Sequence, residues 1–376
     1  MMVTFAISLQ SLPPIFDKIA KDISLSNSQA GTLMGIYAIP GVFLPLFIAF
    51  LANKYNKKSM ILISLIILIG GLISFSLSGS FSALLVSRLA SGIGATVLVV
   101  LAPLLVPIFF SDKNMGIAMG IFNVAVPLGT VISANLFGVL GEKIHWRSII
   151  LGIGIFAGIV LLAIAFGLFL PNSHDKGKTR ISEEKPTKGL FSNVNLWLLA
   201  LIWMLGNFQL LSYVTFAPQY YQGLGMTVQR AGLLTSFIMF VPIIITPFIG
   251  ILIDKTGWKK RLILFGSILI AISFILISRG NSSIAIWAIT LGIGFAPLPV
   301  CVFSLLPELV QPYQVGMGLG IITIASNLGI AVGPSAFGLL LDNTGGNFNL
   351  GFIVLALIPI IIILALSRLK RERAEI

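Results

Sequence analysis

One charged side chain lies inside an apolar run, and it is the first candidate for binding chemistry in this chain. Arg88 stands about six residues into the hydrophobic segment 82–109. Its guanidinium stays protonated and can bind a carboxylate or a phosphate through two parallel hydrogen bonds. Two interpretations stay open. Arg88 binds an anionic solute, or it extends to the nearest interface or braces the first helix through backbone carbonyls.

Polar side chains at helical spacing on other apolar segments are the next candidates. Gln209 and Tyr213 fall on the same face of segment 194–217, and an amide beside a phenol suits hydrogen bonding to a solute. Gln10 is the only long polar side chain in segment 2–16. We expect these three side chains to face a cavity. An interfacial aromatic belt is the alternative role for the tyrosine.

Two asparagines lie in glycine-rich apolar segments, Asn123 in 115–140 and Asn327 in 314–340. Small residues four apart let helix backbones approach closely, so tight packing along a sliding seam competes with solute binding as the role of these faces. Asn123 and Asn327 are retained as candidate solute contacts.

Signals of other chemistry are missing. Acidic side chains are absent from the middle of every apolar segment, whereas a proton pump of the carboxylate type needs a buried acid whose pKa can be raised. One cysteine, Cys301, and two histidines do not make a metal or haem site. The Gly-x-Gly at 92–94 lies inside an apolar run without the strand and acidic partner of a nucleotide site. We therefore expect no enzyme activity, no metal and no cofactor.

Composition places the segments that carry these residues in lipid. The chain has 376 residues, of which 57% are hydrophobic and 10% charged, against about 25% charged in soluble proteins. Runs of about 20 apolar residues can cross a bilayer as helices. The first run is short for a crossing, so either the true start lies upstream or that helix is clipped. Twelve crossings are expected, at 2–16, 29–52, 59–78, 82–109, 115–140, 148–170, 194–217, 228–253, 261–279, 282–306, 314–340 and 349–367.

The distribution of basic residues predicts the orientation. The net charge of +12 is spread over short loops rather than gathered in one domain, which does not favour a nucleic-acid partner. Most Lys and Arg residues fall in one set of alternate loops and in the tail, and such loops are usually cytoplasmic. We expect both termini to be cytoplasmic, in a monomer that spans the cell membrane of a prokaryote. The expected partners are the lipid bilayer and a small-molecule substrate.

The second half of the chain repeats the first at an offset of 200 residues. Gly92-Ile93-Gly94 returns as Gly292-Ile293-Gly294, and Phe137-Gly138 returns as Phe337-Gly338. Two similar apolar halves are typical of transporters with a site between the halves. The repeat predicts an N-terminal six-helix bundle at 1–172, a cytoplasmic linker at 173–192 and a C-terminal six-helix bundle at 193–376. It breaks where Arg88 meets Ala288 and where Asn53 meets Asp254.

Two loop and helix motifs resemble those of the major facilitator superfamily of secondary transporters. The sequence Gly250-Ile-Leu-Ile-Asp254-Lys255-Thr-Gly257-Trp-Lys-Lys is similar to its cytoplasmic loop signature. Arg88-Leu-Ala-Ser-Gly-Ile-Gly-Ala is similar to a second signature, in the fourth helix. The resemblance covers nearly the whole chain. It implies an all-α membrane protein with twelve transmembrane helices in two pseudo-symmetric six-helix bundles, which work by alternating access around a central cavity.

The same motifs suggest a gate at the cytoplasmic face. Asp254, at a helix end, can accept hydrogen bonds from exposed backbone N–H groups of a neighbouring helix, with Lys255 and Gly257 beside it. Asn53 and Lys54 occupy the matching loop of the first half and form a weaker latch, because the asparagine carries no charge. Anchoring of the loops by the positive-inside rule is the alternative role for the lysines.

The expected function is transport of a small solute, driven or facilitated, with a small organic anion as the favoured substrate. In that interpretation Arg88 supplies the charged contact. The alternatives are an exporter of amphiphilic compounds or drugs, and a membrane receptor or scaffold that does not transport. The short loops argue against a receptor.

Overall fold

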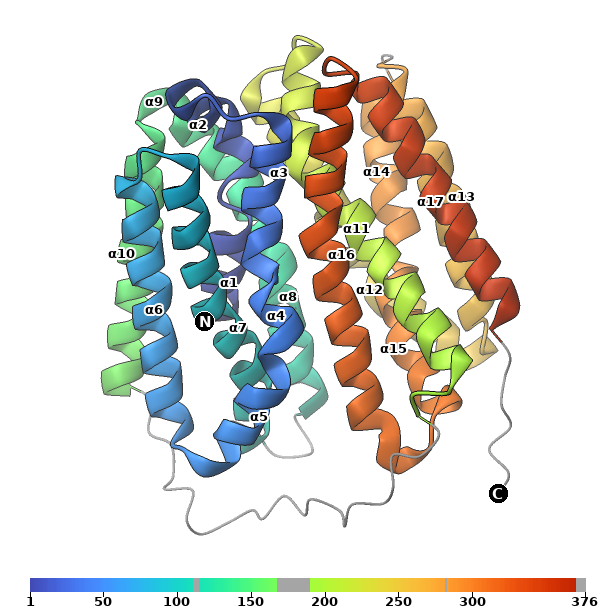
Figure 1. The fold of residues 1–376 in the computed structure, drawn as a ribbon. Helices are drawn as coiled ribbons and strands as arrows, with labels where there is room; N and C mark the ends of the chain where they lie inside the picture. Colours follow the sequence, from blue (N-terminus) through green and yellow to red (C-terminus); the bar gives the residue numbers. More distant parts are fainter. Residues whose placement is uncertain (111–114, 168–189, 281–282, 370–376) are drawn as a thin grey trace.

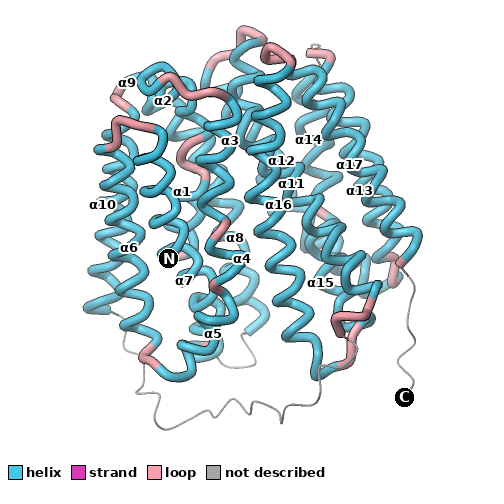
Figure 2. Tube along the Cα trace, in the orientation of Figure 1, coloured by secondary structure: helices cyan, strands magenta, loops and turns pink. Residues whose placement is uncertain are grey.

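The computed structural model describes residues 1–110, 115–167, 190–280 and 283–369. Within these ranges every regular element is a helix (Figures 1 and 2). The elements of the first half are α1 (Met2–Leu9), η1 (Pro13–Ile15), α2 (Phe16–Ile23), α3 (Asn27–Gly35), η2 (Ile36–Ala38), α4 (Pro40–Phe43), α5 (Pro45–Lys54), α6 (Lys57–Leu77), α7 (Phe81–Phe109), α8 (Met115–Ile132), the π-helical turn η4 (Ser133–Phe137), α9 (Gly138–Lys143) and α10 (Trp146–Gly167).

The second half is built mostly from longer helices. These are α11 (Val194–Gly223), α12 (Val228–Thr256), α13 (Lys259–Ser278), α14 (Ile284–Phe295), α15 (Pro297–Leu309), η5 (Pro312–Gln314), α16 (Val315–Asn343) and α17 (Phe348–Arg368). Within the described residues only its fourth crossing is divided, into α14 and α15. The predicted linker at 173–192 lies almost entirely outside the described residues.

The membrane crossings agree with the twelve expected from the sequence. Ten described helical stretches are long and apolar enough to span a bilayer, and an eleventh span is the pair Asn27–Phe43 and Pro45–Ala52, bent by 50°. The remaining crossing is the first, in which α1, η1 and α2 follow one another with a break. The sequence prediction ended this segment at Phe16, but the chain stays helical to Ile23. The charged residues of α2 end the apolar run, but they do not end the helix.

Prolines explain the broken helices of the first half. Pro13 and Pro14 have no N–H to donate back into α1, so α1 ends at Leu9 and a short turn leads into η1. Pro40 and Pro45 divide the second crossing into α3, η2, α4 and α5 in the same way. Broken helices are stable in a membrane only where other protein groups satisfy the freed carbonyls.

The helices form two bundles, α1–α10 and α11–α17, which stand side by side (Figure 1). Lys54, Lys58, Lys255 and Lys259 lie at one end of the molecule, here called the lysine end, whereas α2 and α9 lie at the other, called the α2 end. At the lysine end each bundle is closed by an equivalent contact. The Lys58 ammonium donates to the carbonyl of Ala165 at 2.7 Å, and that of Lys260 donates to Leu369.

Glycines bring the two bundles together along two matching seams. In the first seam α3 packs against α16, and a side chain at Gly31 would collide with the Pro334 carbonyl. In the second, α12 packs against α8 and η4, and a side chain at Gly232 would collide with the Ala134 carbonyl. These residues correspond through the sequence repeat, so the repeat is also a structural one.

Candidate functional site

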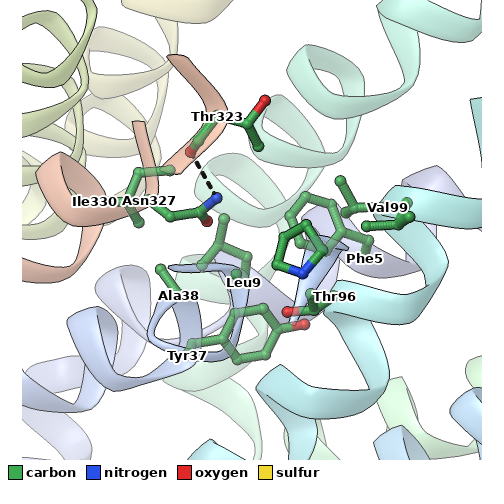
Figure 3. A pocket seen from close by; sticks show the side chains of 12 residues that line it. Phe5, Leu9, Tyr37, Ala38, Thr96, Val99, Thr323, Asn327 and Ile330 are labelled. Carbon is green, nitrogen blue, oxygen red and sulfur yellow. Dashed lines mark hydrogen bonds between the residues drawn. The ribbon is translucent and has the colours of Figure 1, made fainter. Parts of the chain in front are cut away.

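A small cavity lies between the bundles, near the middle of the first and second crossings (Figure 3). Its volume is about 60 Å³, and its walls come from α1, the broken second crossing, α7 and α16. Apolar side chains make most of the wall. The polar exceptions are Tyr37 and Thr96 from the N-terminal bundle and Thr323 and Asn327 from the C-terminal bundle.

Arg88 lies directly behind the Tyr37 wall of this cavity. Its guanidinium carbon is 4.3 Å from the centre of the Tyr37 ring, and only 2% of the residue is exposed. The guanidinium donates to three backbone carbonyls, those of Ser8 at 2.7 Å, Leu9 at 2.6 Å and Leu33 at 3.2 Å. These partners match the second interpretation from the sequence, in which Arg88 braces the first helix.

The break in the first crossing explains why the Leu9 carbonyl needs Arg88. In an unbroken helix the Leu9 carbonyl would accept from the N–H of residue 13, but that residue is Pro13. The Arg88 guanidinium replaces the missing donor. A buried charge normally has an opposite charge beside it. Among the residues that the structure describes, no carboxylate pairs with Arg88, so its positive charge is solvated by carbonyl dipoles and an aromatic ring.

Asn327 is the predicted contact that reaches the cavity. Its side-chain N–H₂ donates to the Thr323 carbonyl one turn earlier at 2.9 Å. Its side-chain carbonyl faces Gly41 of the opposite bundle, where an added side chain would collide with it. Asn327 therefore presents a donor and an acceptor across the interface between the bundles.

The other predicted contacts are not assembled around this cavity. The Gln209 amide donates to the Leu355 carbonyl at 2.8 Å, inside the C-terminal bundle. The Tyr213 hydroxyl pairs with that of Tyr221 at 2.9 Å. Asn123 is exposed on α8. The shared face of Gln209 and Tyr213 was read from periodicity, but that face is turned toward the interior of its own bundle.

Gln10 stands at the break of the first crossing, 4% exposed. Its side-chain carbonyl is one of several buried polar atoms in this region with no hydrogen-bond partner among the described residues. The hydroxyls of Thr4, Ser8 and Tyr37 share this property. The interior of the N-terminal bundle therefore holds unused polar groups close to Arg88.

Tyr37, Thr96 and Thr323 line the cavity and were not among the candidates from the sequence. A signal for Thr96 exists, because Arg88, Gly92 and Thr96 are spaced four apart and share one face of α7. Gly92 on that face lets Tyr37 approach, since a side chain there would collide with the Tyr37 carbonyl. The face of α7 that carries Arg88, Gly92 and Thr96 therefore packs against the broken second crossing.

The predicted gate residues lie at the lysine end, as expected from their loops. Asp254 and Lys255 are exposed at the end of α12, and the described residues offer Asp254 no hydrogen bond or ion pair. Gly257 has a φ of 66° and ends α12 by donating its N–H to Ile253 at 2.7 Å. Lys54 is exposed beside Tyr55. The Asn53 side chain lies outside the described part of the chain.

Comparison with known proteins gives a consistent set of relatives. The family model described as Major Facilitator Superfamily matches residues 1–307 and 214–376. The chain is 24% identical over 351 residues to the nitrite extrusion protein of Bacillus subtilis (strain 168), covering 91% of this chain and 85% of that protein. It is 22% identical over 397 residues to the human lysosomal dipeptide transporter MFSD1, covering 96% and 84%.

Solved structures of other transporters share the fold. A bacterial homolog of the human lysosomal transporter Spinster, solved in an inward-facing and unoccupied conformation, superposes with a TM-score of 0.82. The match covers 99% of this chain and 96% of that one at 17% identity. At this identity the likeness concerns the fold.

Proposed function

The chain belongs to the major facilitator superfamily, and from that premise we propose that it carries a small anion across the membrane through the cavity of Figure 3. It is a multi-pass membrane transporter and not an enzyme. The observation that carries the choice of an anion is the buried Arg88, whose charge has no carboxylate partner among the described residues.

Arg88 carries a net positive charge in an interior that is almost closed to water. Three carbonyl dipoles solvate this charge without neutralising it, and it attracts a negative charge over several ångströms because little water is present to screen it. The Tyr37 ring stacks on the guanidinium, and it also forms a wall of the cavity. An anion in the cavity is favoured by this charge, and a cation is disfavoured by it.

The size of the cavity favours a small solute. One water molecule needs roughly 10–15 Å³ of such volume, so about 60 Å³ accommodates a solute of about four to five heavy atoms. That range includes small carboxylates and inorganic oxyanions. The relative named as a nitrite extrusion protein handles an anion of this size by its name, which supports the same class here.

The hydrogen-bonding groups of the cavity come from both bundles. Tyr37 offers a hydroxyl from one side and Asn327 an amide from the other. The hydroxyls of Thr96 and Thr323 donate to carbonyls of their own helices and are left as acceptors. A solute that bonds to both sides links the bundles, and it can therefore couple its own binding to their movement. We propose Asn327 as the solute contact of the C-terminal bundle.

The close contacts between the bundles suggest the direction in which the cavity opens. The glycine seams at Gly31 and Gly232 join the bundles toward the α2 end, so we infer that a solute reaches the cavity from the lysine end in this conformation. By the positive-inside rule the lysine end faces the cytoplasm. We further propose a monomer, with Asp254, Lys255, Gly257, Asn53 and Lys54 as the gate at that end.

Flux measurements with a charge-neutral variant test the anion proposal. In proteoliposomes the unsubstituted protein should take up nitrite, nitrate, formate or acetate. Arg88→Gln keeps one amide donor for the freed carbonyls but removes the charge, so uptake should fall at least tenfold. Arg147→Gln is the matched control, because Arg147 pairs with Asp22 on the surface at the α2 end.

Folding must be checked in the same samples by size-exclusion profile and melting temperature. Binding of the transported anion should raise the melting temperature of the unsubstituted protein by mass action and leave that of Arg88→Gln unchanged. Equal anion uptake by a folded Arg88→Gln would overturn the proposal. So would flux of neutral amphiphiles without any anion flux.

A further inference from the structure

A carboxylate of one bundle closes a helix of the other at the α2 end. We propose that Asp342 is a latch that holds this end shut, and that Glu142, its counterpart in the repeat, is a weaker one. Asp342 stands near the end of α16, and its partners begin α3 in the opposite bundle. This inference concerns the movement of the bundles and does not depend on which solute is carried.

The first turn of α3 has two backbone donors that its own residues do not satisfy. Ser26 caps the helix by accepting from the Gln29 N–H at 3.2 Å, and the Gln29 side chain accepts from the Ser26 N–H at 3.0 Å. The N–H groups of Asn27 and Ser28 remain.

Asp342 satisfies both of these remaining donors. One carboxylate oxygen accepts from the Asn27 backbone N–H at 3.0 Å and from its side-chain amide at 2.9 Å. The other oxygen accepts from the Ser28 N–H at 2.8 Å. Hydrogen bonds to a carboxylate are stronger than neutral ones, and the positive end of the helix dipole adds to them. All three bonds must break before α16 can leave α3.

The second seam has the same parts in a looser arrangement. Glu142 of α9 corresponds to Asp342 through the repeat, and α12 corresponds to α3. The Glu142 carboxylate accepts from the Gln229 side-chain amide at 3.3 Å. The structure gives it no bond to a backbone N–H of α12 among the described residues.

A difference in helix winding accompanies this asymmetry. α16 runs as one helix from Val315 to Asn343, whereas the equivalent stretch of the first half contains the π-helical turn Ser133–Phe137. A π-helical turn has i→i+5 hydrogen bonds and more residues per turn, so it rotates the later residues around the helix axis relative to a continuous α-helix. Glu142 lies beyond that turn, and Asp342 has no such turn before it.

Proline substitutions at matched positions test the latch without touching the carboxylate. Asn27→Pro removes the backbone N–H and the side-chain amide that bind one oxygen of Asp342. Proline is accepted at the first position of a helix, and the preceding Ser26 is already extended, as a residue before proline prefers. Val228→Pro is the same change at the first position of α12, where Glu142 contacts no backbone.

The opening of the α2 end can be measured directly by the distance between two spin labels. Lys21→Cys and Asn349→Cys place labels on exposed positions of opposite bundles at that end, and the native Cys301 is buried. Distances are recorded by pulsed electron paramagnetic resonance in lipid nanodiscs, without solute. The labelled protein without further substitution is compared with the same protein carrying Asn27→Pro, Val228→Pro, Asp342→Ala or Glu142→Gln.

Asn27→Pro and Asp342→Ala should each raise the ratio of long to short distances at least tenfold. Val228→Pro and Glu142→Gln should change it by less than about twofold. Unchanged distances in both Asn27→Pro and Asp342→Ala would overturn the latch, and an equal shift in Glu142→Gln would overturn its asymmetry. Because no solute is present, failure here leaves the anion proposal intact, and failure of anion uptake leaves the latch intact.

Discussion

The N-terminal bundle buries Arg88 beside Tyr37, whereas the C-terminal bundle has Ala288 at the matching position. The interior of the C-terminal bundle is instead filled by rings, with Tyr213, Phe274 and Phe352 in mutual contact at centroid distances of 5.9 to 6.3 Å. Both interiors hold buried polar atoms without partners among the described residues, so the difference lies in the buried charge of the first and the aromatic core of the second.

The close helix contacts on which these interiors are built are nevertheless the same in the two bundles. A side chain at Gly92 would collide with the Tyr37 carbonyl, and one at the matching Gly292 would collide with the Phe237 carbonyl. The duplicated glycine contacts hold the bundles together, and we propose that the difference between Arg88 and Ala288 serves solute binding. Matched substitutions in the two halves can break this division or sharpen it.

The largest effect is expected at the glycine seams. Gly31→Leu and Gly232→Leu each place a side chain against a backbone carbonyl of the other bundle, and overpacking of this kind costs about 1–3 kcal/mol. The α2 end can then no longer close, so initial uptake rates in proteoliposomes should fall at least tenfold in both variants. Gly152→Leu, in open space on α10, is the control and should transport normally. Loss in one seam variant alone would contradict an equal role of the two halves.

A smaller effect should separate the two buried tyrosines. The Tyr213 hydroxyl is bonded to Tyr221, so Tyr213→Phe should lower the free energy of unfolding by about 1 kcal/mol and leave the uptake rate unchanged. The Tyr37 hydroxyl has no partner among the described residues, so Tyr37→Phe should leave stability unchanged and raise the apparent KM. Melting curves and uptake kinetics of both variants check this. The opposite pattern would place the solute in the C-terminal bundle.

The smallest effect on stability is expected at the lysine contacts that both bundles make with the end of their last helix. Lys58→Met and Lys260→Met each remove an ammonium from the carbonyl end of the last helix of a bundle. A cation at a helix end contributes about 0.3–1 kcal/mol, so both variants should melt slightly earlier, to a similar extent. Uptake should be normal in each. A transport defect in either variant would show that this contact takes part in gating.

The fold could be predicted from the sequence because the features that indicate it are long apolar runs and an internal repeat. Apolar runs located the crossings, and the offset of 200 residues predicted two bundles, which the matching contacts of Gly31 and Gly232 support. The first crossing was predicted too short. The amphipathic α2 continues it beyond Phe16, and apolar length alone does not detect a helix that leaves the lipid.

The candidate site was harder to predict, because periodicity groups residues on a face without showing what that face meets. Gln209 and Tyr213 do share a face, yet it is turned into their own bundle. Tyr37 reaches the cavity because Pro40 and Pro45 break its helix, and the resulting direction is a property of the packed structure. The carboxylate bound to a helix start is Asp342, whereas the motif had drawn attention to Asp254 at the other end.

The break at Pro13 has a consequence for how the protein is made. The Leu9 carbonyl receives its side-chain donor from Arg88, which the ribosome adds about 80 residues later, whereas the Ser8 carbonyl also accepts from the Ser11 hydroxyl. Until the fourth crossing has entered the bilayer, the first cannot hold its broken shape in lipid without unsatisfied backbone groups. We therefore expect the first segment to reach its final, broken conformation only after the segment that contains Arg88 has entered the bilayer.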